Sequence, residues 1–148
     1  MDIFFRGFTA GIVGGVAMNV WSVFVYYVIK ISKMRFLDWA AVFLYGHLPL
    51  TFPEVIYAML VQIGFVGSLG VIMAYFIKAT SPQAYLLKGV IFGLGIGFVI
   101  YAIPTLFQVP GLVVIPFPTV LANHVGGIIW GFTTAYVLEY LDKRLKAS

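Results

Sequence analysis

Four long apolar segments constrain this sequence more than any other feature. They cover residues 3–31, 53–77, 85–107 and 117–141, and about 20 apolar residues are enough for one helical crossing of a bilayer. Only 9% of the 148 residues are charged, whereas roughly a quarter are charged in soluble domains. Backbone groups in lipid must find their hydrogen-bond partners within the segment, which favours helices. The sequence therefore predicts an all-α integral membrane protein with a single domain of four transmembrane helices.

A shorter apolar stretch lies between the first two segments. Residues 36–48 read FLDWAAVFLYGHL and include Asp38 and His47. This stretch is apolar enough to enter the membrane but too short to span it. We therefore predict an interfacial or re-entrant helix, with Trp39 and Tyr45 at the level of the lipid headgroups.

The basic residues predict how the chain is oriented. Four crossings place both termini on one side, and six of the nine Lys and Arg residues then share that side. Because cytoplasmic loops carry the excess of Lys and Arg, both termini are predicted to be cytoplasmic. No basic run is interleaved with aromatic residues in the manner of a nucleic-acid-binding face, so membrane lipids are the expected surroundings and nucleic acid is not an expected partner.

Small residues recur at helical spacing in all four segments. Residues three or four apart share one face of a helix, and small residues there let neighbouring helices approach closely in lipid. All four stripes lie toward the predicted cytoplasmic half. The glycines of these stripes, which we predict to be helix-packing residues of glycine-zipper type, are Gly7, Gly11, Gly15, Gly67, Gly70, Gly89, Gly93, Gly97, Gly127 and Gly131.

Larger and polar residues continue the same stripes away from the glycines. Helices that meet closely at one end and carry bulk at the other should splay, which predicts an outward-facing and partly polar cleft. The candidate ligand-binding residues of this cleft are Asn19, Gln62, Tyr101, Asn123 and His124.

Two structural alternatives stand beside the ligand-binding interpretation. Asn19 and Gln62 could be an interhelical hydrogen-bond pair, a common role for amides in membrane helices. His124 could be a neutral imidazole bonded to a neighbouring helix, although ionisable residues inside a membrane are rare and often functional.

The residues offer little catalytic chemistry. The sequence contains no cysteine and no paired carboxylates within the apolar segments, and it lacks a His-Glu-x-x-His motif or a serine nucleophile elbow. We therefore predict no catalytic residue, no metal site and no enzymatic activity. Haem is the one cofactor that the sequence leaves open, because the imidazoles of His47 and His124 could both ligate one iron.

The first and third segments contain a matching pattern. A basic residue and a glycine, followed by two glycines at four-residue spacing, occur from Arg6 to Gly15 and again from Lys88 to Gly97. This pattern predicts either a duplicated helical hairpin, with halves 1–78 and 85–148, or a similarity that arises from composition alone.

The segment from Arg6 through Gly11 and Gly15 to Trp21, with residues 62–75 and 89–94, resembles the small four-span bacterial proteins of the YqhR type. Residues 123–139 are similar to the last span of YagU-type inner-membrane proteins. These families are largely uncharacterised. The resemblance implies a bacterial cytoplasmic (inner) membrane and four helices, and it transfers no catalytic residue.

Three functions follow as hypotheses. The first is a non-enzymatic accessory or scaffold subunit, or a homo-oligomer, since four helices need not use every glycine surface internally. The second is a small transporter or channel that uses the cleft. The third is a haem-binding electron-transfer anchor.

Overall fold

The computed structural model describes residues 1–147, and most of them are helical. The helices are α1 (Ile3–Phe24), which continues into the π-helical turn η1 (Val25–Ile29), α2 (Phe36–Tyr45), α3 (Phe52–Thr80), α4 (Tyr85–Leu106) and α5 (Phe117–Ala147). Three stretches, Ile3–Ile29, Phe52–Thr80 and Tyr85–Leu106, are long and apolar enough to cross a membrane. The prediction of a helical membrane protein is confirmed to this extent.

The observed ends of the helices differ from the predicted ends for local reasons. Lys30 has a left-handed backbone (φ 61°), and α1 with η1 ends just before it, two residues earlier than expected. Gly46 likewise has a φ of 76° and ends α2 at Tyr45, a common way to stop a helix. At the start of α3, the side chain of Thr51 accepts a hydrogen bond from the backbone N–H of Glu54, and this cap begins the helix at Phe52.

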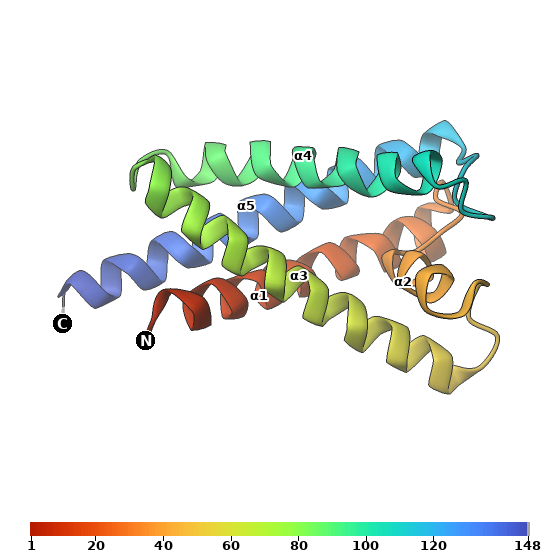
Figure 1. Cartoon of the computed structure of the whole chain (residues 1–148), viewed down its shortest axis with the longest axis horizontal. Helices are drawn as coiled ribbons and strands as arrows, with labels where there is room; N and C mark the ends of the chain where they lie inside the picture. The colour runs from red at the N-terminus through yellow and green to blue at the C-terminus, as the bar shows by residue number, and fades with distance from the viewer. Residues whose placement is uncertain (148) are drawn as a thin grey trace.

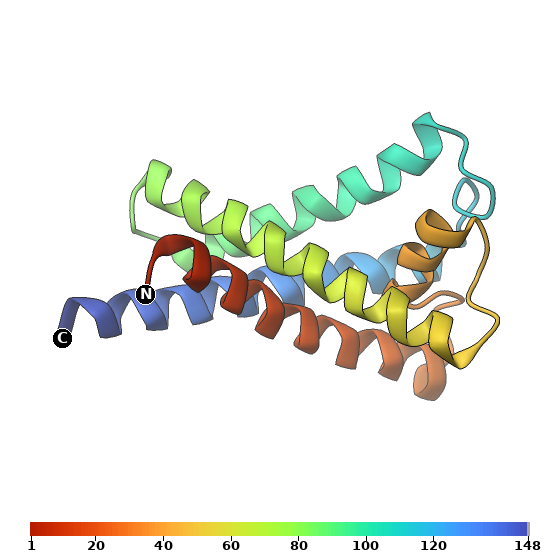
Figure 2. The same cartoon turned by 60° about the horizontal axis from the view of Figure 1, so that its bottom comes forward.

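The four long helices stand side by side in the order α3, α1, α5, α4 (Figures 1 and 2). Helices α1 and α5 are therefore the two inner helices, and α5 lies between α1 and α4. Helix α5 is the least apolar of the four because its last turns carry the charged residues Glu139, Asp142, Lys143, Arg144 and Lys146. Its polar side chains Thr119, Asn123 and Thr134 are buried against protein.

The two ends of the bundle differ in how closely the helices approach. We call the end with both termini and the α3–α4 connection the terminal end, and the opposite end, where α2 lies, the α2 end (Figure 1). Helices α3 and α4 start together at the terminal end and diverge toward the α2 end (Figure 2). The separation lies between α3 and α4, and the outward-facing direction of the opening stays a prediction.

Glycines make the α1–α3 contact so close that no side chain would fit. A Cβ atom on Gly7 would lie 2.6 Å from Cα of Val71, and one on Gly11 would lie 2.5 Å from the carbonyl oxygen of Val66. Gly70 in turn faces the backbone of Gly7 and Gly11. The hydrophobic effect does not drive helices together in lipid, so close van der Waals packing of the two backbones must stabilise this contact.

The α4–α5 contact repeats this arrangement. Gly89 faces the carbonyl oxygen of Gly131, and Gly93 faces that of Gly127. Gly97 packs more loosely, since its Cβ would lie 3.6 Å from the His124 ring. The pairs α1–α3 and α4–α5 thus use glycines at corresponding positions, while the duplication of a helical hairpin stays a prediction.

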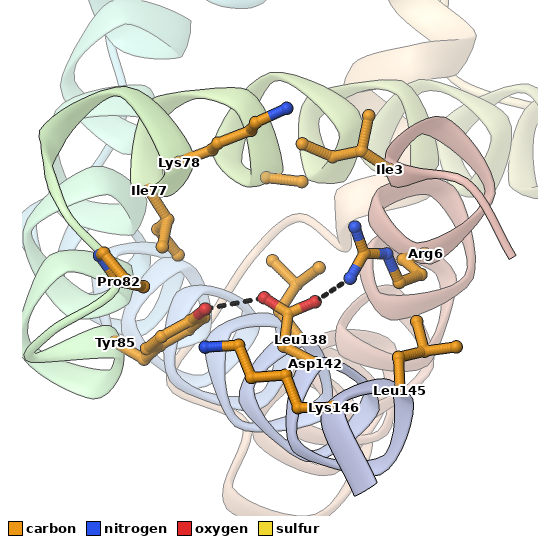
Figure 3. A pocket seen from close by; sticks show the side chains of 11 residues that line it. Ile3, Arg6, Ile77, Lys78, Pro82, Tyr85, Leu138, Asp142, Leu145 and Lys146 are labelled. Atoms are coloured by element: carbon orange, nitrogen blue, oxygen red, sulfur yellow. Dashed lines mark hydrogen bonds and ion pairs between the residues drawn. The ribbon is translucent and has the colours of Figure 1, made fainter. Parts of the chain in front are cut away.

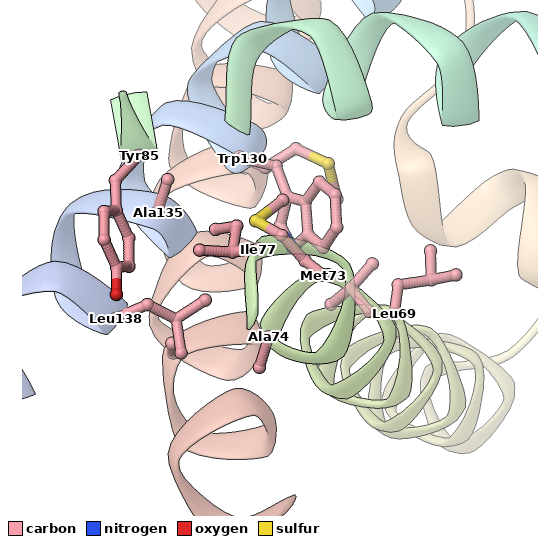
Figure 4. Close-up of a cluster of buried hydrophobic side chains, with 11 residues drawn as sticks. Leu69, Met73, Ala74, Ile77, Tyr85, Trp130, Ala135 and Leu138 are labelled. Carbon is pink, nitrogen blue, oxygen red and sulfur yellow. The ribbon is translucent and has the colours of Figure 1, made fainter. Parts of the chain in front are cut away.

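A cluster of buried apolar side chains fills the bundle near the terminal end (Figure 4). Leu69, Met73 and Ile77 of α3 pack there against Trp130 and Leu138 of α5. The indole N–H of Trp130 also donates a hydrogen bond of 3.2 Å to the carbonyl oxygen of Gly11 on α1. The apolar contacts thus tie α3 to α5 in spite of the intervening α1, and the hydrogen bond ties α5 to α1.

Polar contacts join three helices at the terminal end itself. Asp142 of α5 forms an ion pair with Arg6 of α1, and its second carboxylate oxygen accepts a hydrogen bond of 2.6 Å from the hydroxyl of Tyr85 on α4 (Figure 3). One carboxylate therefore holds α1, α4 and α5 together where the glycine contacts begin.

Candidate functional site

A cleft of about 410 Å³ lies between α3 and α4, where these two helices separate. We refer to it as the lateral cleft. Residues from α1 to α5 line it, including Met18, Val61, Ile100 and Trp130. Its size falls in the range of about 300–1,000 Å³ that is typical of small-molecule sites.

The lining of the lateral cleft is apolar and rich in aromatic rings. None of its residues is charged, judged over residues 1–147. The aromatic residues that line it are Phe36, Trp39, Phe43, Phe65, Tyr101 and Trp130. Such a lining favours an apolar, uncharged occupant, because a charge would lose its hydration without gaining a partner.

Four of the five candidate cleft residues form two polar pairs. Asn19 donates a hydrogen bond of 2.8 Å to Oε1 of Gln62, which joins α1 to α3. Asn123 donates one of 2.9 Å to the Tyr101 hydroxyl, which joins α5 to α4. Gln62, Tyr101 and Asn123 line the lateral cleft, whereas Asn19 reaches it only through Gln62.

The orientation of the Gln62 amide follows from its neighbours. Nδ2 of Asn19 donates to the carbonyl oxygen of Gly15 at 2.8 Å as well as to Gln62. A carbonyl oxygen can only accept, so the Asn19 nitrogen must face Gly15, and both of its hydrogens are then used. The Gln62 oxygen consequently faces Asn19. Nε2 of Gln62 is left without a partner, although the side chain is only 7% exposed.

Trp39 brings a second unpaired donor to the same cleft. Its indole Nε1 has no hydrogen-bond partner, and the residue is only 5% exposed. The ring packs edge-on against Tyr101, with 4.8 Å between the ring centroids. Of the three buried polar side-chain atoms without a partner in residues 1–147, two therefore belong to the lining of the lateral cleft.

A polar cluster at the start of α2 fixes the position of Trp39. The Arg35 guanidinium binds both carboxylate oxygens of Asp38, at 3.1 and 2.8 Å, and it also donates to the Tyr27 hydroxyl at 3.0 Å. The hydrogen bond with Asp38 raises the pKa of Arg35. The Phe36 backbone N–H donates to the Ser22 hydroxyl on α1 at 3.1 Å, so α2 is held against α1 as well.

The two histidines have separate surroundings. His124 packs against Tyr101, with 5.2 Å between the rings, and its Nδ1 lies 2.8 Å from the Val120 carbonyl oxygen. It contacts lining residues but does not line the lateral cleft itself. His47 stacks on Tyr45 in the exposed chain after α2. The structure therefore does not bring the two imidazoles together as a haem site would need.

A second and smaller pocket, of about 300 Å³, lies at the terminal end (Figure 3). Arg6, Lys78, Lys146 and Asp142 contribute charges to its lining. Arg6 and Asp142 form an ion pair with each other. We therefore interpret the pocket as a surface hollow beside the polar contacts that join α1, α4 and α5.

Sequence reasoning missed several residues that shape the cleft and the bundle. Gly14 contacts Thr134 and Trp130 of α5, and Gly126 contacts Phe36 and Trp21. Each lies next to a glycine of a stripe but on a different face of its helix. The stripes predicted one packing face on each of these helices, whereas the structure uses two. Trp39 was expected at headgroup level, and no sequence pattern indicated that its indole would line a cleft.

No protein-family model, curated protein or solved structure matches the chain. No group of three or more His, Cys, Asp or Glu side chains in residues 1–147 could hold a metal ion.

Proposed function

We propose that this protein is a non-enzymatic integral membrane protein that binds an apolar molecule of the bilayer in its lateral cleft and serves as an accessory subunit or scaffold. The observation that carries the proposal is the separation of α3 and α4 around an uncharged, aromatic cleft of about 410 Å³. A molecule dissolved in the bilayer could enter sideways between the two helices without passing through water.

The membrane setting is part of the proposal. We propose that α5 is a fourth crossing, because it lies between two helices that are apolar enough to span and its polar side chains are buried against them. We further propose that both termini are cytoplasmic, in a bacterial inner membrane. The resemblance to YqhR-type and YagU-type proteins supports this setting.

The contacts of the cleft favour binding over ion passage. Its polar side chains pair with one another, Asn19 with Gln62 and Asn123 with Tyr101. A path for ions would need polar groups that can replace water along its length, and the remaining lining is apolar.

Assembly into a homo-oligomer remains a smaller part of the proposal. The glycine stripes are largely used within one chain, but Gly64 on α3 and Gly95 on α4 have open space beside them. A second copy could pack closely at either position. A Gly95→Leu variant should then lower the oligomer fraction measured by native mass spectrometry.

The binding function can be tested with two tryptophan variants on neighbouring residues. Val61 lines the mouth of the lateral cleft, whereas Leu60 faces away from it and is 62% exposed. We expect native mass spectrometry of the wild type, released from lipid nanodiscs, to show a retained apolar molecule. Val61→Trp should lose that molecule and Leu60→Trp should keep it. Equal retention by the two variants, or none by the wild type, would contradict the proposal.

A further inference from the structure

We propose that the occupant of the lateral cleft is a flat, uncharged ring with two carbonyl oxygens and an apolar tail, the chemistry of a prenylated quinone. The amide N–H of Gln62 and the indole N–H of Trp39 would donate hydrogen bonds to its carbonyl oxygens. This inference rests on the proposed function, since it names what the cleft holds.

Two hydrogen-bond donors of the cleft lining have no acceptor within the protein. Nε2 of Gln62 and Nε1 of Trp39 are both buried without a partner, and both belong to side chains that line the lateral cleft. Buried donors are almost always paired in folded proteins, and an exception calls for a missing acceptor. A bound water needs two to four polar partners, which the apolar remainder of the lining does not offer.

The unpaired amide of Gln62 lies deep in the bilayer. Gln62 lies ten residues after Phe52 in α3, or about 15 Å along the helix at 1.5 Å per residue. A hydrocarbon layer of about 30 Å centred on this helix includes that position. The acceptor must therefore reach below the headgroups. A phospholipid would carry its phosphate toward a lining without a charged side chain, so an uncharged molecule fits better.

Aromatic rings form much of the lining of the lateral cleft. The rings of Trp39 and Tyr101 pack edge-to-face at 4.8 Å, and both face the cleft together with Phe36 and Phe65. Aromatic rings pair with a flat ring in stacked or edge-to-face geometry and gain more than their buried area supplies. A conjugated ring with carbonyl groups can stack on the aromatic side chains and accept hydrogen bonds from the two donors. Two flexible acyl chains would only cover apolar surface.

The experiment uses a decyl-substituted benzoquinone with ¹³C-labelled carbonyl groups, added to the full-length protein in nanodiscs. Hydrogen bonding to the cleft should shift the labelled carbonyl band in the infrared to lower frequency than in protein-free nanodiscs. Decylbenzene, which has the ring and tail without the oxygens, should bind more weakly. Dioctanoylglycerol, a flexible uncharged dicarbonyl, should compete poorly.

Two tryptophan variants separate hydrogen bonding from packing. Trp39→Phe removes an N–H that has no partner within the protein, so the fold should be retained. Trp130→Phe also changes a ring of the cleft, but its N–H already donates to Gly11. We expect Trp39→Phe to weaken quinone binding roughly five- to tenfold, the effect of one hydrogen bond, and to abolish part of the band shift. Trp130→Phe should weaken binding only through lost packing and should leave the band shift of the bound quinone in place. Gln62→Leu should remove the other part of the band shift.

The band shift and the two tryptophan variants decide the proposal. A shifted band that Trp39→Phe reduces and Trp130→Phe does not supports the proposal. An unshifted band, equal effects of the two variants, or full competition by dioctanoylglycerol overturns it. If decylbenzene binds as well as the quinone and Val61→Trp abolishes both, the cleft is a binding site and only this inference fails. If nothing binds, the proposed function fails as well.

Discussion

Oε1 of Gln62 accepts a hydrogen bond of 2.8 Å from Nδ2 of Asn19, across the contact between α3 and α1. The pair lies beyond the glycines of this contact, toward the α2 end, where the helices begin to carry larger side chains. The bond pairs the Asn19 nitrogen with the Gln62 oxygen. The Gln62 nitrogen has no partner within the protein, and Gln62 lines the lateral cleft. A contact between helices and a candidate ligand donor are thus provided by the same side chain.

The Asn19–Gln62 bond should add only modestly to stability. Interhelical hydrogen bonds in membranes contribute about 0.6 kcal/mol on average and at most about 1.7 kcal/mol. A double-mutant cycle with Asn19→Leu and Gln62→Leu, read from the free energy of unfolding in mixed micelles, should give a coupling within that range. A coupling near zero would show that the two amides do not meet in the membrane.

The glycine contact between α4 and α5 predicts opposite outcomes for two alanine variants. At Gly93 a Cβ atom would collide with the backbone of Gly127, whereas at Gly95 nothing lies within 4 Å. Gly93→Ala should lower the free energy of unfolding by about 1–3 kcal/mol because the helices must shift. Gly95→Ala should leave it unchanged or raise it by up to about 1 kcal/mol through helix propensity. Thermal unfolding in micelles would show the contrast, and similar effects at both positions would contradict the packing described.

The Asp142 carboxylate should contribute more to the free energy of unfolding than the carboxylate of Glu139, one helical turn earlier. Asp142 bonds to both Arg6 and Tyr85 and is 27% exposed, whereas the ion pair of Glu139 ends on Lys143, which is 75% exposed. We expect Asp142→Asn to cost about 1–3 kcal/mol in unfolding free energy, as for hydrogen bonds to charged groups. Glu139→Gln should cost about 0–1 kcal/mol, as for surface pairs. Equal losses, measured by the same unfolding assay, would show that Asp142 does not hold three helices together.

The Arg35 cluster predicts how firmly α2 is held. Arg35→Lys keeps the positive charge but loses the two-pronged contact with Asp38, which an ammonium group cannot form. Backbone amides of α2 should then exchange hydrogen roughly fivefold faster or more, as measured by mass spectrometry in nanodiscs. Lys33→Arg, at an exposed position nearby, should leave the exchange unchanged.

The same cluster predicts no pH dependence near neutrality from Arg35. Its pKa is raised by the hydrogen bond with Asp38, so the stabilisation is fully present below the ordinary pKa of arginine. It is lost only as the pH rises through the raised pKa. Protection factors of α2 amides should therefore stay level between about pH 7 and 9 on account of this group, and a steady fall across that interval would contradict the assignment.

Much of the bundle follows from patterns in the sequence. The four apolar segments and the stretch at 36–48 predict all five α-helices to within a few residues, apart from the longer C-terminal end of α5. The glycine spacing predicts which helix faces pack closely, and the position of the stripes predicts an end that is closed and an end that splays. In the structure Gly7, Gly11, Gly89 and Gly93 face the backbone of a neighbouring helix, and such close packing in lipid requires small side chains.

The partners of each face could not be predicted in the same way. A stripe such as Gly7, Gly11 and Gly15 shows that another helix can pack closely there. It does not show which helix that is. The place of α5 between α1 and α4 and the contacts of Gly14 with it depend on how all helices pack together. For the same reason the sequence grouped His124 with the cleft, whereas the structure lines the cleft with Trp39 instead.

Distances between spin labels on α3 and α4 test the central claim most directly, namely that the bundle is closed by glycines at the terminal end and open between these two helices at the α2 end. The chain has no cysteine, so labels on introduced cysteines are unique. One pair, Phe76→Cys with Phe92→Cys, replaces rings that lie 5.8 Å apart, and the other, Val61→Cys with Ile103→Cys, replaces lining residues on opposite sides of the lateral cleft. In lipid nanodiscs we expect a short distance for the first pair and a clearly longer one for the second. Equal distances for the two pairs would mean that α3 and α4 run together along their whole length, and the lateral cleft would not exist.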